Sequence, residues 1–338
     1  MLRRACISGL LFVLFSISLS TVAISQTTLL LDSQPQLVLS GDEQFQDFII
    51  PKNDSLNQLI LEAKGADGGW IEYTYKDRFN AIRTQRVQAG EGATVSAVYS
   101  IGTGLGEIPP LSTLRMLVGK RGEWSKHDLL TPGQYGGGGG GGTAILISKD
   151  RGTSWQILMV AGGGGGAGVQ FMNGQLTNRP GIPASDEEYG SAGDTQNPTA
   201  TPGKRGYGGG SVNMSGGGGG AYSDGEHLSG VLYYGNAGWK DAKLASEPLG
   251  GLGGIQEKTR KGGWGFGGGG SGDLGGGGGG GYSGGGAAQP GNGGGGGGSY
   301  LNQIAFRPMT SSKQQNDYTK NPGDGYIRYM LMKKNQNR

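Results

Sequence analysis

Residues 262–302 read GGWGFGGGGSGDLGGGGGGGYSGGGAAQPGNGGGGGGSYLN. Glycine loses more backbone freedom on folding than any other residue, so such a stretch is costly to order. Four aromatic residues interrupt it: Trp264, Phe266, Tyr282 and Tyr300. The stretch is therefore either a disordered linker or a structure that only glycine can build.

Similar glycine runs recur through the second half of the chain. The main runs are four to seven residues long, at 136–142, 162–166, 216–220, 267–270, 275–281 and 293–298. A linker has no reason to keep its run lengths similar. An extended helix with three residues per turn points every N–H and C=O outward, and without Cβ atoms several such helices can bond to one another. We therefore expect a bundle of polyglycine II helices, framed by strands and by aromatic residues at the run ends.

The first part of the chain has the pattern of a β-sandwich. Short β-branched or aromatic runs alternate with Gly, Pro, Asn and Asp, and no helical period is sustained before residue 119. These runs lie at 36–39, 47–50, 58–63, 70–76, 93–99 and 114–119, and two more follow between glycine runs at 143–148 and 155–161. The sequence predicts a mainly β fold with little α-helix.

The closing segment GDGYIRYMLM, residues 323–332, is a further strand candidate. Alternate residues put one face of this strand in a position to be buried, so we expect it to return and pair with the first strands. The glycine-rich region is then an insertion between strands. The predicted division is a signal peptide at 1–25, sandwich strands at 26–135, an inserted glycine-rich domain at 136–322, and a returning strand and tail at 323–338.

The N-terminus has the features of a secretory signal. Arg3 and Arg4 precede an apolar run, and the small residues Ala23 and Ser25 stand where signal peptidase requires them. We predict cleavage between Ser25 and Gln26, secretion, and no membrane span afterwards; an uncleaved signal anchor is the alternative. Cys6 is the only cysteine, so residues 26–338 contain no disulfide and must be held by packing and hydrogen bonds.

Charge and residue usage argue against several functions. The net charge is +3, and losing the two basic residues of the signal leaves 27 Lys and Arg against 26 Asp and Glu, or +1; this is too little to indicate a nucleic-acid partner. His127 and His227 are the only histidines, so a Cys/His zinc site is excluded and neither has a nucleophile elbow nearby. A G-x-G-x-x-G match at 265–270 carries no information in so glycine-rich a chain. We predict no enzymatic activity, no catalytic residues, no cofactor and no metal, and both histidines on loops.

Three local motifs have ordinary structural explanations. Residues 148–155 fit the S-x-D-x-G-x-x-W pattern of an Asp-box, here favoured as a plain hairpin turn over a remnant glycan site. Asp186, Glu187 and Glu188 lack the alternating oxygen spacing of a calcium loop, so a solvated loop is favoured over a calcium site or a contact with a basic partner. Asn53 and Asn213 are N-glycosylation sequons if the host is a eukaryote.

Several segments resemble the glycine-rich extracellular domain of the anaplastic lymphoma kinase and leukocyte tyrosine kinase receptors. They are GGGGGGGTAILISKDRGTSWQILMVAGGGGGAG (136–168), GGWGFGGGGSGDLGGGGGGGYSGGGAA (262–288), GDGYIRY (323–329) and LILEAKGADGG (59–69). As in that family, a glycine run leads to a strand, a charged turn, a strand ending in Ala and another run. The similarity covers roughly 110–330. It implies a polyglycine-helix bundle grafted onto a tumour-necrosis-factor-like β domain, the pair binding a protein ligand.

This sequence also departs from the family, because it lacks the kinase domain, the membrane span and the cysteines. Unrelated glycine-rich adhesins, including phage tail-tip proteins, use comparable packing, so only the architecture is carried over. We predict a secreted, non-enzymatic protein-binding module whose partner is a protein ligand or a cell-surface or matrix component. The alternatives are a structural or adhesive glycine-rich protein, and a truncated receptor tyrosine kinase ectodomain lacking its kinase.

Overall fold

The computed structural model describes residues 35–39, 45–53, 55–193, 200–226, 233–239, 247–255, 259–319 and 322–333. Within these ranges the regular structure is strand and no helix is present. The strands form two five-stranded sheets, two three-stranded sheets and one two-stranded pair. The predicted mainly β fold is thus confirmed for the described residues, while the predicted signal peptide with Ser25 and Gln26 lies outside them.

Two five-stranded antiparallel sheets form the larger β unit. The first has the order β1 (Gln36–Leu39), β18 (Tyr326–Lys333), β3 (Leu56–Lys64), β7 (Thr94–Ser100) and β16 (Thr310–Gln314). The second has the order β15 (Tyr300–Leu301), β12 (Gln156–Ala161), β11 (Thr143–Ser148), β8 (Thr113–Leu117) and β2 (Phe45–Ile49). We refer to these two sheets as the main sandwich.

One hydrophobic core joins the two sheets of the main sandwich. Every second side chain is buried from Leu59 to Ala63 of β3 and along the whole of β7, as the alternating apolar pattern requires when one face of a strand is covered. These side chains pack with buried side chains of β8, β11 and β12 from the second sheet. The arrangement is sandwich-like, as the spacing of the strands in the sequence indicated.

The closing strand β18 lies inside the first sheet, between β1 and β3. Ile327 is directly opposite Val38 on one side and Ala63 on the other, and all three side chains are buried. Tyr329 packs against Phe48, with 4.8 Å between ring centroids. A strand from the end of the chain therefore completes a sheet begun near residue 36.

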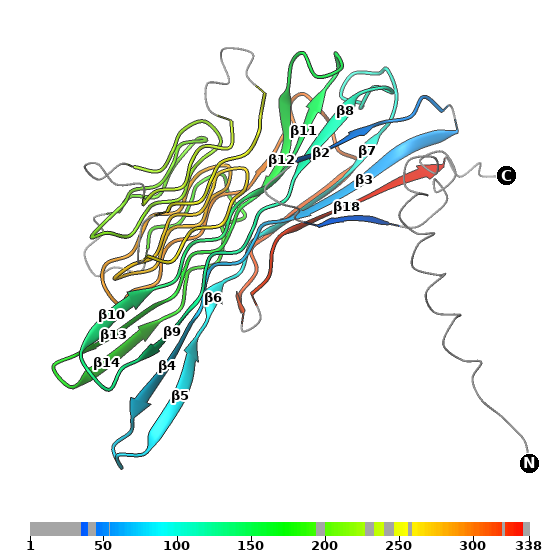
Figure 1. Ribbon diagram of the computed structural model, residues 1–338. Coiled ribbons are helices and arrows are strands. Elements are labelled where there is room, and N and C mark those ends of the chain that lie inside the picture. The colour runs from blue at the N-terminus through cyan, green and yellow to red at the C-terminus, as the bar shows by residue number, and fades with distance from the viewer. Residues whose placement is uncertain are drawn as a thin grey trace, which may run out of the picture.

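Two smaller sheets lie at the opposite end of an elongated molecule (Figure 1). One has the order β5 (Ile82–Val87), β4 (Ile71–Lys76) and β9 (Ser125–Asp128), with β4 and β9 parallel. The other has the order β10 (Gly133–Gly136), β13 (Gly168–Met172) and β14 (Gln175–Arg179). Their buried residues share one core that includes Ile71, Tyr73 and Val169. We call residues 71–87, 125–136 and 168–179 the tip.

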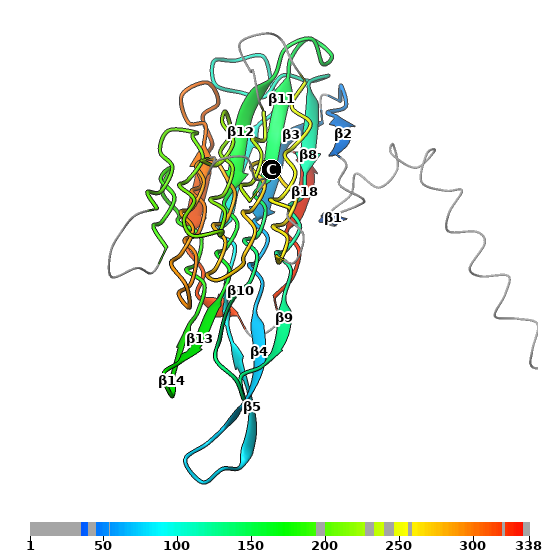
Figure 2. The ribbon, with the colours of Figure 1, turned by 60° about the vertical axis from the view of Figure 1, so that its left-hand side comes forward.

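Five chain segments connect the main sandwich to the tip, at 65–70, 88–93, 118–124, 137–142 and 162–167. Each is the direct continuation of a strand of the main sandwich into a strand of the tip. The second contains β6 (Ala89–Gly90), which pairs with β17 (Tyr318–Thr319). These segments and the later glycine runs lie side by side along the length of the molecule (Figure 2).

The structure divides the chain differently from the predicted ranges. Strands β11, β12, β15 and β16 fall within 136–322 but pair in the main sandwich, and β4, β5 and β9 fall within 26–135 but belong to the tip. The reason is that each connecting segment joins strands in two different sheets, so neither unit is continuous in sequence. Strands β5, β14 and β16 were not predicted because they are polar and largely exposed; pairing with an apolar neighbour defines them.

Candidate functional site

The glycine run at 136–142 donates backbone hydrogen bonds with a period of three residues. Every third N–H donates to the same neighbouring segment, and three neighbours are bonded in turn. The bonds run from 136, 139 and 142 to the carbonyls of 273, 270 and 267, from 137 and 140 to those of 167 and 164, and from 138 and 141 to those of 123 and 120. Side chains are not needed for any of these contacts.

The run at 275–281 is the central one, because six segments surround it. Its N–H groups donate to carbonyls at 292 and 295, at 137 and 140, and at 216 and 219. Its carbonyls accept from N–H groups at 163 and 166, at 285 and 288, and at 270. The donor–acceptor distances range from 2.7 to 3.2 Å. We refer to the runs 136–142, 162–167, 216–220, 267–270, 275–281, 284–288 and 293–298 as the glycine lattice.

No side chain fits in the central run of the glycine lattice. A Cβ added at any of the residues 276–280 would lie only 1.9 to 2.1 Å from a carbonyl oxygen of a neighbouring segment. Cβ atoms in real structures essentially never come within 3.0 Å of another heavy atom. The glycine runs are therefore required by close contact between backbones and are not linkers.

Aromatic side chains separate the lattice from the second sheet of the main sandwich. Trp264, Phe266 and Tyr282, which interrupt the glycine stretch in the sequence, are buried there together with Trp155. Tyr300 stacks on Tyr282 with 4.3 Å between ring centroids. These large apolar surfaces provide the hydrophobic stabilisation that a lattice of backbone hydrogen bonds lacks.

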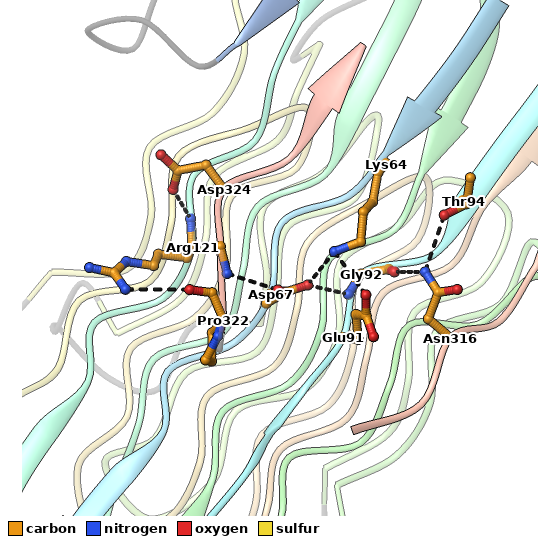
Figure 3. Close-up of polar contacts among 10 residues, drawn as sticks. Lys64, Asp67, Glu91, Gly92, Thr94, Arg121, Asn316, Pro322 and Asp324 are labelled. Atoms are coloured by element: carbon orange, nitrogen blue, oxygen red, sulfur yellow. Dashed lines mark hydrogen bonds and ion pairs between the residues drawn. The ribbon is translucent and has the colours of Figure 1, made fainter. Parts of the chain in front are cut away.

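A buried carboxylate fixes the C-terminal part of the chain to the connecting segments (Figure 3). Asp67 is 3% exposed and accepts hydrogen bonds from Lys64 Nζ at 2.9 Å, Gly92 N at 2.9 Å and Gly323 N at 2.8 Å. Lys64 also pairs with Glu91 at 3.1 Å. Burial disfavours the Lys64 ammonium, but Asp67 and Glu91 outweigh it and raise the pKa of Lys64.

Further hydrogen bonds complete this junction (Figure 3). Asn316 Nδ2 donates to Gly92 O at 2.6 Å and to Thr94 Oγ1 at 3.1 Å. Arg121 N donates to Asp324 Oδ1 at 2.9 Å. Sequence analysis missed Asp67; the signal was a single acidic residue between small residues in GADGG, where the close-packed backbone leaves N–H groups for it to accept. The Lys64 ammonium is paired with the carboxylates of both Asp67 and Glu91, so we assign the junction a structural role.

The Asp-box residues form the predicted hairpin turn between β11 and β12. Asp150 Oδ1 accepts from Ser154 N at 2.8 Å and from Ser148 Oγ at 2.7 Å. Hydrogen bonds from Ser154 and then Ser148 lower the pKa of Asp150 to about 2. Arg151 and Gly152 take positive φ values of 58° and 91°. The Asp150 carboxylate therefore stabilises the turn through hydrogen bonds within it.

His127 lies on strand β9, which corrects the prediction of a loop. Its ring stacks on that of Tyr135, a residue of β10 in the other small sheet, with 3.6 Å between centroids. Burial, with a contribution from the charge of Arg260, lowers the pKa of His127 to about 4. His227 lies outside the described residues. The described part of the chain holds no group of three residues with metal-ligating side chains.

The two sequons differ in their surroundings. Asn53 is exposed beside β3, where its Oδ1 accepts from Ser55 N at 3.0 Å. Asn213 is also exposed, in a turn with φ of 42°. The hydroxyl of its sequon partner Ser215 is buried and donates to Gly275 O at 2.8 Å. The second sequon is therefore partly built into the lattice.

The acidic residues 186–188 lie on a loop beside the lattice. Glu187 is exposed, and Lys313 Nζ lies 3.9 Å from its carboxylate. The contact is long and surface-exposed, so it adds little stability. The structure brings no other predicted site residue to this loop.

A concave cleft of about 510 Å³ opens at the tip, between the β4–β5 hairpin and the β13–β14 hairpin. Its walls include Tyr75, Leu129, Phe171 and Leu176, and its mouth includes the strongly exposed Phe79. Ligand sites in proteins are concave and mostly apolar with a few polar groups. Sequence analysis missed this cleft because its walls come from segments about a hundred residues apart.

Comparison with known protein families finds no family model that matches this chain, and comparison with curated proteins finds no matching protein. None of the described segments forms a helix with the length and apolar character needed to cross a bilayer.

Proposed function

We propose that the chain is a secreted, non-enzymatic protein-binding module in which a tumour-necrosis-factor-like β-sandwich carries an inserted bundle of polyglycine II helices. The observation that carries the proposal is the central run 275–281, which is hydrogen-bonded to six neighbours with no space for a Cβ. A period of three with all bonds directed outward is what polyglycine II helices provide.

The lattice supports a binding role because it holds the tip rigidly relative to the main sandwich. A surface that is ordered before binding does not lose conformational entropy when a partner arrives, so more of the contact energy appears as affinity. The central run of the lattice consists of backbone alone and offers no acid, base or nucleophile. We therefore infer that recognition uses the exposed surfaces of the main sandwich and the tip, at the two ends of the lattice.

Adhesion is a second candidate, favoured by the elongated shape in Figure 1. The tip lies at the far end from the main sandwich, as a surface-contacting end does. The two functions differ in partner: a receptor-like module binds one protein in a defined stoichiometry, whereas an adhesin binds a cell surface or matrix with many copies.

Affinity capture tests the proposal. Immobilised residues 26–338, with folding verified by circular dichroism, are exposed to extracellular fluid and solubilised surface proteins from the source organism, and captured proteins are identified by mass spectrometry. We expect one protein to be captured saturably, with a fixed stoichiometry on repurification. Binding only to intact cells or matrix favours adhesion. Failure of the folded chain to capture anything under all these conditions rejects both.

A further inference from the structure

We propose that the tip cleft binds a segment of a partner protein in which an apolar anchor side chain is flanked by Asp or Glu residues. This occupant presupposes the protein-binding function proposed above and names the surface and chemistry used for it. Three features of the tip carry the inference: the shape of the cleft, the exposure of its rim and the distribution of charge around it.

The cleft is a hollow with an apolar floor and walls. Leu129 is buried at its base, and Tyr75, Phe171 and Leu176 are half-buried around it. A volume of about 510 Å³ is in the range of pockets that hold small ligands. A flat bilayer surface would leave such a hollow unfilled, whereas a projecting side chain would fill it.

The rim of the cleft exposes apolar side chains that a protein without a binding partner would be expected to bury. Phe79 is 73% exposed and Leu130 is 42% exposed, and both line the mouth. Ile82, on the same hairpin as Phe79, is 65% exposed. Gathered apolar exposure at one end of a soluble protein marks an interaction site.

The charge of the tip is positive. Its three segments hold six basic residues (Lys76, Arg78, Arg83, Arg86, Lys126 and Arg179) and three acidic residues (Glu72, Asp77 and Asp128), a net charge of +3. Residues 26–338 together carry only +1. Positive charge is therefore concentrated in the tip, and two of its basic residues, Lys76 and Arg78, line the cleft.

The acidic groups of the tip are all engaged within the tip. Asp77 accepts from Phe79 N at 2.8 Å, from Ala81 N at 3.0 Å and from Arg83 Nε at 2.9 Å. Asp128 accepts from Leu130 N at 3.0 Å and from Thr74 Oγ1 at 3.3 Å. Glu72 pairs with Lys126 at 2.8 Å and with Arg86 at 3.5 Å.

Two basic side chains at the mouth of the cleft are available for an ion pair with a partner. Among the described residues, neither Lys76 nor Arg78 forms an ion pair with a carboxylate, and both line the cleft. The Arg78 guanidinium lies over the Phe79 ring, 4.8 Å from its centroid. An apolar anchor entering the hollow would place its neighbouring residues beside these cations, which favours carboxylates there.

The cleft is held in shape by a buried tyrosine. The Tyr73 hydroxyl donates to Gln85 Oε1 at 2.7 Å and accepts from Asn178 Nδ2 at 2.7 Å. These bonds tie β14 of one small sheet to β4 and β5 of the other. The site is thus formed before any partner binds.

The test uses synthetic peptides as probes, because the partner protein is unidentified. Residues 26–338, labelled with ¹³C in the Leu methyl groups, are titrated with the peptides EEWEE, EESEE and KKWKK and, separately, with phosphatidylserine vesicles. We expect EEWEE to shift the methyl signals of Leu129 and Leu176 saturably, more weakly at high salt, and the other two peptides to bind at least tenfold more weakly. No shift of these signals by EEWEE, equal binding of KKWKK, or binding of vesicles without peptide binding overturns the proposal.

Charge reversal provides the matched control. The double variant Lys76→Glu/Arg78→Glu is expected to weaken EEWEE binding at least tenfold. The control variant Lys52→Glu/Arg151→Glu, which alters exposed residues in loops between strands of the main sandwich, is expected to leave it unchanged. Both variants must keep the thermal transition of the wild type. The same variants are used in affinity capture. Equal capture by the Lys76→Glu/Arg78→Glu variant and the wild type overturns the cleft assignment but preserves the protein-binding function, whereas no capture by the wild type overturns that function.

Discussion

Replacing Gly278 by alanine tests whether the glycine lattice is close-packed. The added Cβ would lie 2.0 Å from Gly285 O, 2.7 Å from Gly285 C and 2.9 Å from Gly218 N. All three are backbone atoms, so no flexible side chain can move aside. To reach 3.0 Å, the shortest separation that real Cβ atoms show, the Gly285 backbone must retreat by about 1 Å (3.0 minus 2.0).

That movement breaks hydrogen bonds on both sides of Gly285. Its N–H donates to Gly279 O at 2.7 Å, and its carbonyl accepts from Gly218 N at 2.9 Å. A buried backbone group left without a partner costs about 1–3 kcal/mol, so freeing the N–H and C=O of Gly285 costs about 2–6 kcal/mol. Domains are stable by only about 5–15 kcal/mol, so much of the stability would be lost.

Gly323 provides the matched control, because an added Cβ there meets no atom within 4 Å and its φ is outside the left-handed region. Where the backbone conformation is permitted, Gly→Ala stabilises by about 0.4–1 kcal/mol through the unfolded state. Urea unfolding of residues 26–338, followed by circular dichroism and tryptophan fluorescence, should show a large loss for Gly278→Ala and little change for Gly323→Ala. Equal unfolding midpoints for the two variants would refute close packing of the lattice.

Three further outcomes follow from particular residues. N-terminal sequencing of the secreted chain should begin at Gln26, and recovery of residues 1–25 in a membrane-bound product would contradict cleavage. Deleting residues 323–338 removes β18 from between β1 and β3 and exposes core side chains opposite Ile327 and Leu331. Residues 26–322 should therefore lose the cooperative thermal transition. Retention of that transition would show that β18 is dispensable. Burial lowers the pKa of His127 to about 4 in the folded state, whereas an unfolded histidine has a pKa of about 6.5. Between these two values the unfolded state binds more protons than the folded state, so the free energy of unfolding should fall as the pH drops from about 6.5 towards 4. The wild type should lose more than a His127→Asn variant, and an NMR titration of His127 with an ordinary pKa would remove the basis for that difference.

Strands with an apolar pattern could be recognised from the sequence, whereas polar strands could not. The runs that became β3, β11 and β12 are rich in Leu, Ile and Val and stand beside glycine, so their state follows from local preference and burial. Strand β5 has the sequence IRTQRV and is mostly exposed. It is a strand because β4 offers it a row of backbone partners, which is a property of the tertiary structure.

The candidate binding cleft could not be predicted from the sequence for a related reason. Tyr75 lies in the strand predicted at 70–76, whereas no strand was predicted around Phe171, and neither residue has a motif around it. They meet because β4 and β13 both continue segments that cross the glycine lattice in the same direction. Only the lattice brings the two hairpins to one end of the molecule.

The amino-acid sequence by itself determined that the chain is mainly β and that its glycine runs can be approached by other backbones from every side. Tertiary structure decided which backbones those are. A run such as 275–281 has no side chains to distinguish one face from another, so its six neighbours cannot be read from it. They are selected by the strands and aromatic residues at the ends of the runs, because only these have the shape and apolar surface to set position and register.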